Sequence, residues 1–318
     1  MQSNMEIIYD LSQADIVCEC AATIGVFDGV HAGHQFVIRQ MMEDAQQQGY
    51  KSMVITFDKL PQQLFVPDFH AQLLTTLDEK QQLLETLGID YLVVLPFTEE
   101  IAQQSAYQFM AQVLQQRLHV KMLRIGYDNR FGRGRSEGFD DYVRFGRELG
   151  IDVREGVKKD IAGFLHPVSS SLIRQLLAEE GRAADAQKLL TRPYLLSGRV
   201  VAGEHIGTGL GFPTANLAPN SADKLIPLAG VYAVWATIDG GQPFQAMMNI
   251  GHRPTFDGRQ TTLEVNIFDF EGDLYDHMLT IAFVARLRSE QRFESPEALA
   301  NQLEMDKQQV KHIFEDIK

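Results

Sequence analysis

Short apolar runs alternate with amphipathic stretches along the first 180 or so residues of the chain. The apolar runs predict strands at 21–27, 52–57, 90–95, 121–126 and 151–154. Apolar residues at helical spacing predict helices at 33–48, 77–87, 98–117 and 138–149. Strands that alternate with helices are typical of a doubly wound α/β domain with a parallel sheet. We therefore predict such a domain for this part of the chain.

From about Ala183 the pattern changes to closely spaced strands interrupted by glycine. A short helix over 183–190 precedes strands at 195–202, 230–238, 244–250, 262–268 and 279–286. Strands at this spacing indicate a small closed antiparallel barrel. A stripe of apolar residues predicts a closing helix at 296–317, formed by Leu299, Leu303, Val310, Ile313, Phe314 and Ile317. We place the domain boundary after residue 182, which gives domains 1–182 and 183–318.

Composition adds limits on size and partners. A chain of 318 residues is long enough for two domains, and 45% hydrophobic with 22% charged residues is ordinary for a globular protein. The formal net charge of −13 argues against nucleic acid or an anionic membrane as a partner. Any phosphate site must therefore be locally basic or contain a metal ion, for which Mg²⁺ is the expected choice.

The two cysteines and the N-terminal segment exclude further classes. Cys18 and Cys20 are two residues apart, which suits neither a disulfide framework nor a complete zinc site. The segment MQSNMEIIYD lacks a basic and apolar targeting signal, and no apolar run approaches about 18 residues. We expect a cytoplasmic protein.

The segment GVFDGVHAGH at 25–34 joins the first predicted strand to a helix. Gly29 loosens the backbone, and the N–H groups that open the helix favour an anion. His31 and His34 lie three residues apart near the first turn, so both imidazoles can face one phosphate. The alternative is a solvated loop that happens to contain two histidines.

Two further segments qualify for the same site. VSSSLIR at 168–174 opens a helix in which Ser169 and Ser170 would contact phosphates and Arg174 would neutralise departing pyrophosphate. An ordinary serine-rich helix cap is the alternative.

GYDNRFGRGRSEG at 126–138 follows another strand, at the sheet edge where ligands of such folds gather. Asp128 is a candidate contact for the nucleotide or its magnesium, and Arg130, Arg133 and Arg135 for phosphates. A solvated basic loop remains open as the alternative.

A second phosphate loop is predicted in the barrel part, at GEHIGTGLGFPTANL (203–217). Its glycines would let main-chain N–H groups approach phosphates; they are Gly203, Gly207, Gly209 and Gly211. Pro213 fixes the local backbone, while Thr214 and Asn216 present oxygens on one side of an extended run, as a Mg²⁺ site requires. Glycine-rich turns without a ligand are the alternative.

These motifs together resemble a known family. GVFDGVHAGH resembles the HxGH signature of the nucleotidyltransferase superfamily, and VSSSLIR resembles its ISSTxIR segment. PTAN resembles the nucleotide loop of riboflavin kinases, as do, in the same order, MNIGHRPTF (248–256), LEVNIFDF (263–270), DLY (273–275) and RLRSEQRF (286–293). The resemblance covers nearly the whole chain and is to the prokaryotic bifunctional riboflavin kinases/FAD synthetases.

The resemblance implies a Rossmann-like FMN adenylyltransferase domain followed by a riboflavin-kinase-like barrel. Its substrates are riboflavin, FMN and ATP, with Mg²⁺ as cofactor. In the first domain, His31 and His34 would be catalytic and the nucleotide would contact Gly25, Phe27, Asp28, Gly29, His31, His34, Asp128, Arg130, Ser169, Ser170 and Arg174. In the second domain, Thr214 and Asn216 would bind the metal, and the nucleotide would contact Gly203, Gly207, Gly209, Gly211, Pro213, Thr214 and Asn216.

Glu264 corresponds to the catalytic glutamate of the family. It lies in a predicted strand in which Leu263 and Val265 face the opposite way. A carboxylate near the ribityl 5′-hydroxyl can accept its proton during attack on the γ-phosphate, whereas the alternative is a solvent-facing strand carboxylate. Asn249, Arg288 and Phe293 match flavin-binding positions, with ordinary barrel packing as the alternative for Phe293.

Several positions depart from the family pattern. Lys59 and Leu60 replace the usual Pro-His, and Asn129 replaces an aromatic residue. Thr208-Gly209 stands where Arg-Thr is common, and Asp276 stands where glycine is expected. Two alternatives therefore stay open: a monofunctional riboflavin kinase with an impaired first domain, and a non-catalytic flavin-binding regulatory module. The sequence leaves the oligomeric state, direct transfer of FMN and the preferred flavin redox state open.

Overall fold

Two units make up the chain in its computed structural model, Met1–Ser170 and Ser171–Lys318. The structure describes residues 5–14, 16–66, 69–127, 129–202, 212–255 and 258–316. Each unit is described by itself below. The functional boundary after residue 182 stays a prediction.

A six-stranded parallel sheet forms the centre of the first unit, in the order β1-β4-β3-β2-β5-β6. The strands are β1 (Glu6–Ile8), β2 (Cys20–Ile24), β3 (Lys51–Phe57), β4 (Tyr91–Leu95), β5 (Val120–Ile125) and β6 (Asp152–Glu155). The chain runs outward from β2 to β3 and β4 and then returns to β5 on the other side of β2. The strand order therefore reverses between β2 and β5, where doubly wound sheets bind ligands.

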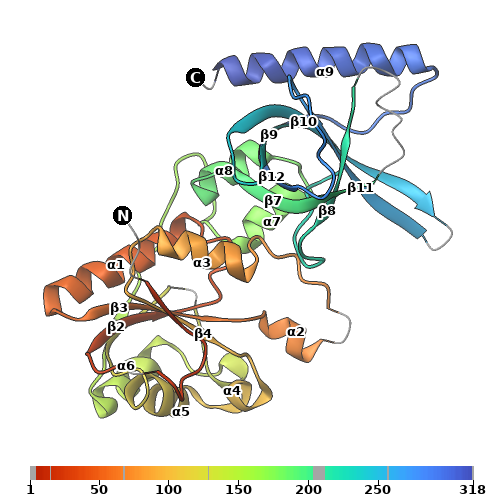
Figure 1. The fold of residues 1–318 in the computed structure, drawn as a ribbon. Helices are drawn as coiled ribbons and strands as arrows, with labels where there is room; N and C mark the ends of the chain where they lie inside the picture. The colour runs from red at the N-terminus through yellow and green to blue at the C-terminus, as the bar shows by residue number, and fades with distance from the viewer. Residues whose placement is uncertain are drawn as a thin grey trace. The chain divides into compact units, whose positions relative to one another are not determined.

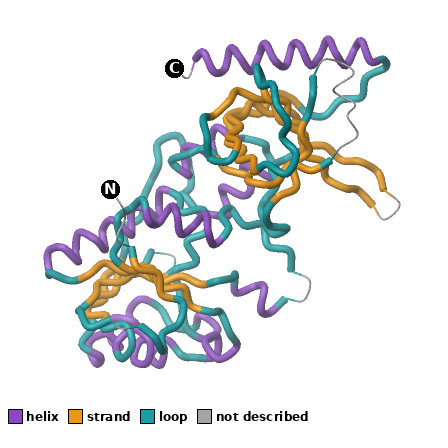
Figure 2. The backbone as a smooth tube through the Cα atoms, in the orientation of Figure 1, coloured by secondary structure: helices purple, strands orange, loops and turns teal. Residues whose placement is uncertain are grey.

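Helices cover both faces of this sheet (Figure 1, Figure 2). On one face lie α1 (Ala32–Gln48) and α3 (Leu77–Glu85), and on the other α4 (Glu99–Gln103), α5 (Ala106–Phe109) and α6 (Phe139–Leu149). Successive strand residues alternate between two apolar clusters, as Val54 and Ile55 do. The strands are nearly all apolar because both of their sides are buried. The predicted doubly wound domain is confirmed.

The helix predicted at 98–117 is wrong as a single element. It divides into α4, α5 and a π-helix, η1 (Met110–Gln115). Ser105 restarts the helix, because its hydroxyl accepts a hydrogen bond from the Gln108 backbone N–H and the Gln108 side chain accepts one from the Ser105 N–H. The sequence pattern also misses the short β1 and α2 (Pro61–Phe65).

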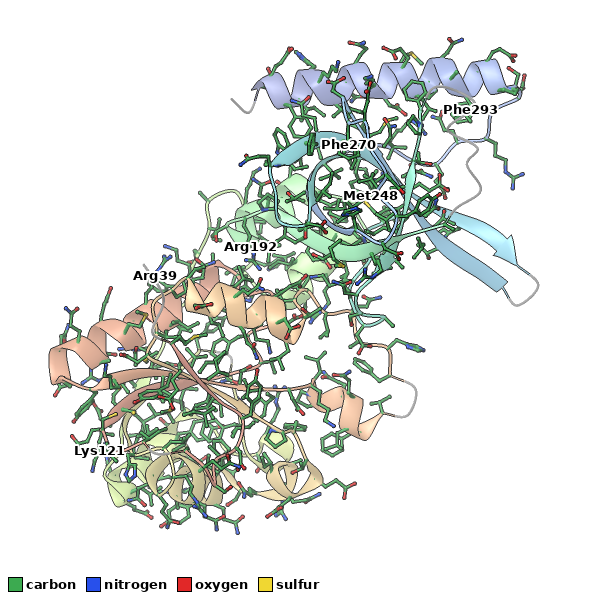
Figure 3. The ribbon with its side chains drawn as sticks, in the orientation of Figure 1. Arg39, Lys121, Arg192, Met248, Phe270 and Phe293 are labelled. Atoms are coloured by element: carbon green, nitrogen blue, oxygen red, sulfur yellow. The ribbon has the colours of Figure 1, made fainter. Side chains whose placement is uncertain are left out.

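Six antiparallel strands close into a barrel in the second unit, in the order β10-β11-β8-β7-β12-β9. They are β7 (Tyr194–Val201), β8 (Ala215–Pro219), β9 (Gly230–Ile238), β10 (Pro243–Thr255), β11 (Gly258–Ile267) and β12 (Met278–Arg288). Met248 is labelled within this barrel in Figure 3 and is fully buried, as are Tyr232 and Phe283, whose rings meet edge to face with centroids 5.2 Å apart. The predicted closed barrel is confirmed.

Helices α7 (Ser170–Ala178), α8 (Ala183–Leu190) and α9 (Pro296–Asp316) complete the chain. The closing helix α9 lies against the outer face of the barrel, where the Phe314 ring centroid is 4.2 Å from that of Trp235. Val310 and Phe314 are buried, as their apolar stripe predicts. Among the described helices, none combines the length and the apolar character needed to cross a membrane.

Candidate functional site

The loop between β2 and α1 makes a sharp left-handed turn at the strand-order reversal. Strand β2 ends at Ile24, three residues before the predicted end. Phe27 and Val30 adopt φ values of 51° and 39°, and Gly29 adopts 82°. Non-glycine residues seldom occupy this region, which is typical of constrained ligand-binding turns. The turn places His31 at the start of α1.

His31 and His34 form a stacked pair at this helix start. His31 is the N-cap of α1, and its Nδ1 accepts a hydrogen bond of 3.3 Å from the His34 backbone N–H. The two rings are stacked with centroids 3.5 Å apart, and the Phe27 ring meets His34 edge-on at 5.2 Å. The predicted histidine pair therefore shares one face.

Burial lowers the pKa of His34 well below its usual value, and the charges of His31 and Lys80 lower it further. The imidazole is therefore neutral at pH 7 and carries a single N–H donor. Its Nδ1 is buried and has no hydrogen-bond partner among the described residues. A phosphate oxygen at this nitrogen would satisfy it, because buried polar atoms are rarely left unpaired.

Asp28 connects the same loop to the segment that precedes α3. Its carboxylate accepts hydrogen bonds of 3.0 Å from the backbone N–H groups of Leu74 and Thr75. The Thr75 hydroxyl in turn accepts a hydrogen bond of 3.0 Å from the Gly29 N–H. These bonds give Asp28 a positioning role, while its contact with a nucleotide stays a prediction.

The serine-rich segment meets the histidine loop. The Ser170 hydroxyl donates a hydrogen bond of 2.9 Å to the backbone carbonyl of Asp28, 142 residues away. At Gly33 a Cβ atom would lie 2.9 Å from Val168 Cγ1, so only glycine permits this approach. Ser169 directly precedes α7, and Arg174 lies one turn along it. Two motifs far apart in sequence thus converge.

The loop after β5 is attached to the end of β2. The Asn129 side-chain amide donates a hydrogen bond to the carbonyl of Ile24. Nearby, the Tyr142 hydroxyl accepts a hydrogen bond of 3.0 Å from the Phe131 N–H and donates one of 2.9 Å to the Phe131 carbonyl. Asn129, although it departs from the family pattern, therefore joins the two loops that flank the strand-order reversal.

Three predicted basic residues of this loop, Arg130, Arg133 and Arg135, are exposed. Asp128 lies outside the described residues. Their roles stay predictions.

Substitution of Asn129 by aspartate should loosen this junction. The carboxylate cannot donate to the Ile24 carbonyl and would face it with a like partial charge. We expect the free energy of unfolding to fall by about 1–3 kcal/mol. Chemical denaturation followed by circular dichroism would measure the loss. Asn220→Asp, at an exposed position of the second unit, is the matched control. Equal stability of the two variants would show that the Asn129 bond contributes nothing.

Three predicted residues of the second site form one row across neighbouring strands. Glu264 of β11 pairs in register with Asn249 of β10 and with Asn216 of β8. Directly paired residues have their side chains on the same face of the sheet, about 5 Å apart. The row lies on the outer face of the barrel, because the intervening Leu263 and Val265 are buried on the other face.

Asn266 extends this row and was not predicted. It is 6% exposed, and its side-chain amide donates a hydrogen bond of 2.7 Å to the carbonyl of Pro213. Asn266 thereby fixes the segment that carries Thr214. The sequence could have indicated this supporting residue, because Asn266 lies two residues after Glu264 and therefore on the same face of the strand.

The second site offers oxygen donors that fit Mg²⁺. The Thr214 hydroxyl and the Asn216 amide are hard ligands of the kind this ion binds together with substrate phosphates. Within the described ranges, no three His, Cys, Asp or Glu side chains gather as a possible metal site. The loop glycines Gly203, Gly207, Gly209 and Gly211 lie outside the described residues, as does Thr208.

The predicted flavin-binding pair is attached to α9. The Arg288 guanidinium lies 5.8 Å from the centre of the Phe293 ring. Arg288 Nε donates a hydrogen bond of 3.0 Å to the carboxylate of Asp306, which is 1% exposed. Gln302 donates a second bond, of 2.9 Å, to the same carboxylate. Figure 3 shows Phe293 beside the start of α9. Flavin contact by Arg288 and Phe293 stays a prediction.

Asp276 stands where the family has glycine, and the backbone shows why glycine is preferred there. Its φ is 64°, in the left-handed region that glycine enters without strain. Aspartate tolerates this conformation better than most residues. The departure therefore preserves the turn before β12.

Comparison with known proteins assigns each unit. The family model described as FAD synthetase matches residues 13–171, and that described as riboflavin kinase matches residues 190–314. The chain is 36% identical over 307 residues to the bifunctional riboflavin kinase/FMN adenylyltransferase of Escherichia coli K12, covering 96% of each chain. It is 34% identical over 304 residues to the Bacillus subtilis 168 protein of the same name, covering 93% of this chain and 92% of the relative.

A solved structure shares the whole architecture. It is that of a Streptococcus pneumoniae protein described as a macrolide-efflux protein. It superposes with a TM-score of 0.87 at 28% identity over 96% of this chain and 98% of that one. The description concerns the other protein only. The two family models follow one another along the chain, and the relatives that name both activities match over more than nine-tenths of both chains. The chain belongs to the bifunctional riboflavin kinase/FMN adenylyltransferase family.

Proposed function

We propose that the chain makes FAD from riboflavin in two steps, each with ATP as co-substrate. The second unit phosphorylates riboflavin to FMN, and the first unit joins FMN to AMP and releases pyrophosphate. The observation that carries this proposal is the presence of both family models, one on each unit. It favours neither a kinase with an impaired first domain nor a flavin-binding module without turnover.

In the kinase step, Glu264 accepts the proton of the ribityl 5′-hydroxyl as the oxygen attacks the γ-phosphorus of ATP. The O–H bond and the bond between the γ-phosphorus and the β,γ-bridging oxygen break, a new P–O bond forms, and ADP leaves. The row of Asn249, Glu264 and Asn216 supports this assignment because it aligns a base with amide groups on one face. Arg288 and Phe293 cover the isoalloxazine plane.

In the adenylyl-transfer step, the phosphate of FMN attacks the α-phosphorus of ATP. The nucleophile is already anionic, so no protein base is required. His31 and His34 donate hydrogen bonds to the phosphate oxygens on which charge develops. Ser169, Ser170 and Arg174 contact the β- and γ-phosphates and neutralise the departing pyrophosphate. The stacked histidines and the Ser170 bond to the loop support these roles.

Thr214 and Asn216 would hold Mg²⁺ in the kinase site, and Asp128 is the candidate contact in the first site. When bound, the ion would screen phosphate charge. The partners are the small molecules riboflavin, FMN and ATP. We further propose a cytoplasmic location and no nucleic-acid or membrane partner, as the acidic composition suggests.

One incubation tests the proposal. The protein is mixed with riboflavin, ATP and Mg²⁺, and the flavins are separated by chromatography. We expect FMN first and FAD later. FMN that accumulates without FAD would identify a monofunctional kinase. Unchanged riboflavin would identify a binding module.

A further inference from the structure

Lys80 is a buried cation that the mechanism above does not use. It lies on α3 and is only 6% exposed. Lysine is almost never this buried unless it is paired, because its charged form loses hydration. The carboxylates that act on its charge are Asp28 and Asp58, and it acts in turn on His34. A lysine on the solvent-facing side of a helix needs no such charged partners, so the burial of Lys80 calls for an explanation.

The Lys80 ammonium is connected to the histidine loop by a short hydrogen-bond chain. Lys80 Nζ donates a bond of 3.2 Å to the Thr56 hydroxyl, and that hydroxyl donates a bond of 3.1 Å to the carbonyl of Val26. A second bond, of 3.4 Å, runs from Nζ to the carbonyl of Phe57. Both strand residues lie at the carboxyl end of β3, which pairs with β2. The charge is therefore fixed at the ligand-binding edge of the sheet.

We propose that Lys80 is a positioning residue of the adenylyl-transfer site, which anchors the 25–34 loop through Thr56 and holds a positive charge beside the histidine pair. This inference rests on the proposed FAD synthesis by the first unit. Burial is the main reason that the His34 imidazole is a neutral donor, and the Lys80 charge lowers the pKa of His34 further. This charge also offsets part of the negative charge that a triphosphate and FMN bring into the crevice.

The ionisation of Lys80 gives the proposal a measurable signature. Burial lowers the pKa of Lys80 to about 8, although Asp28 and Asp58 act in the opposite direction. The ammonium is mostly charged at pH 7 and loses its charge as the pH rises through 8. Adenylyl transfer should therefore decline above about pH 8. Arginine keeps its charge throughout this range, so Lys80→Arg should extend activity to higher pH.

Three variants separate charge from anchoring. Lys80→Met removes the charge and the bonds, Lys80→Arg keeps the charge, and Thr56→Val removes only the hydroxyl link. With FMN and ATP as substrates, we expect Lys80→Met to lower kcat/KM for FAD formation roughly 10- to 100-fold and to abolish the alkaline decline. Thr56→Val should lower the rate less and keep the decline near pH 8. Riboflavin phosphorylation by the same samples should not change, because it is assigned to the second unit. Thermal unfolding followed by circular dichroism checks that the first unit of each variant is folded.

Nuclear magnetic resonance titration of His34 supplies a readout that does not depend on turnover. We expect its pKa to rise in Lys80→Met and to remain low in Lys80→Arg. An unchanged His34 titration together with an unchanged pH profile in Lys80→Met would overturn the proposal and leave Lys80 a packing residue. Absence of FAD from the wild-type protein would instead overturn the proposed function, and the titration would still test the position of the charge.

Discussion

Loss of the histidine pair should remove FAD synthesis and leave riboflavin phosphorylation intact. His31 and His34 are stacked at the start of α1. In the proposed mechanism they supply the donors for the phosphate under attack. Removal of one preorganised donor typically costs a factor of about 10²–10³ in rate. For His31→Ala/His34→Ala we therefore expect FAD formation from added FMN to fall at least about 10³-fold. Chromatography of initial rates would measure it.

The N-cap role of His31 must be separated from its chemistry. Alanine at this position also removes a helix cap, at a cost of about 1 kcal/mol. Asparagine is a good N-cap, so His31→Asn/His34→Ala keeps α1 capped and should lose nearly as much activity. His70→Ala, at an exposed position of the same unit, is the matched control and should leave the rate of FAD formation unchanged. Loss of both activities in the double variant would argue against two separate sites.

Elements whose signals are local were predictable from the sequence. Helix α1 ends where Gly49 allows it to, with φ of 71° and N–H bonds back to Ala45 and Gln46. Strand β9 has the predicted bounds, Gly230–Ile238. In both cases the residues that decide the structure lie inside or next to the element. The same holds for the apolar stripe of α9, which packs on the barrel as predicted.

Features that depend on distant partners were not predictable. Strand β1 has only three residues and exists because β4 pairs with it. Lys80 occurs in an amphipathic helix, where a lysine is normally solvated, and only the folded sheet reveals its bond to Thr56. The Asn129 bond to Ile24 likewise spans 105 residues. A single sequence names candidate residues, but the contacts that orient them arise only on folding.

The candidate sites show the same division. The sequence nominated Asn216, Asn249 and Glu264 separately, and strand register places them in one row. It nominated Arg288 and Phe293 as a flavin pair but did not indicate the buried Asp306 that holds Arg288. Supporting residues such as Asp306 and Asn266 do not belong to a sequence motif. Any element that packs beside the site can supply a side chain that orients a functional residue.

Glu264→Gln should stop FMN formation while FAD synthesis from added FMN continues. Glutamine has nearly the shape of glutamate but cannot accept the hydroxyl proton, and general bases typically contribute a factor of about 10²–10⁴. We expect a fall of that size in the riboflavin phosphorylation rate, with little change in the KM for ATP, because the carboxylate acts on the hydroxyl in the transition state. Separate assays with riboflavin and with FMN would measure both steps.

The control for Glu264 is a second glutamate of the barrel unit. Glu271 is exposed and lies outside the row of Asn249, Glu264 and Asn216, so Glu271→Gln should leave both rates unchanged. Glu264→Asp keeps the carboxylate but shortens its reach by one methylene, and it should retain part of the activity. If Glu264→Gln phosphorylates riboflavin at the wild-type rate, the base must be sought elsewhere. If it loses FAD synthesis from FMN as well, the two reactions do not use separate sites. The barrel row would then take part in a reaction that is assigned to the first unit.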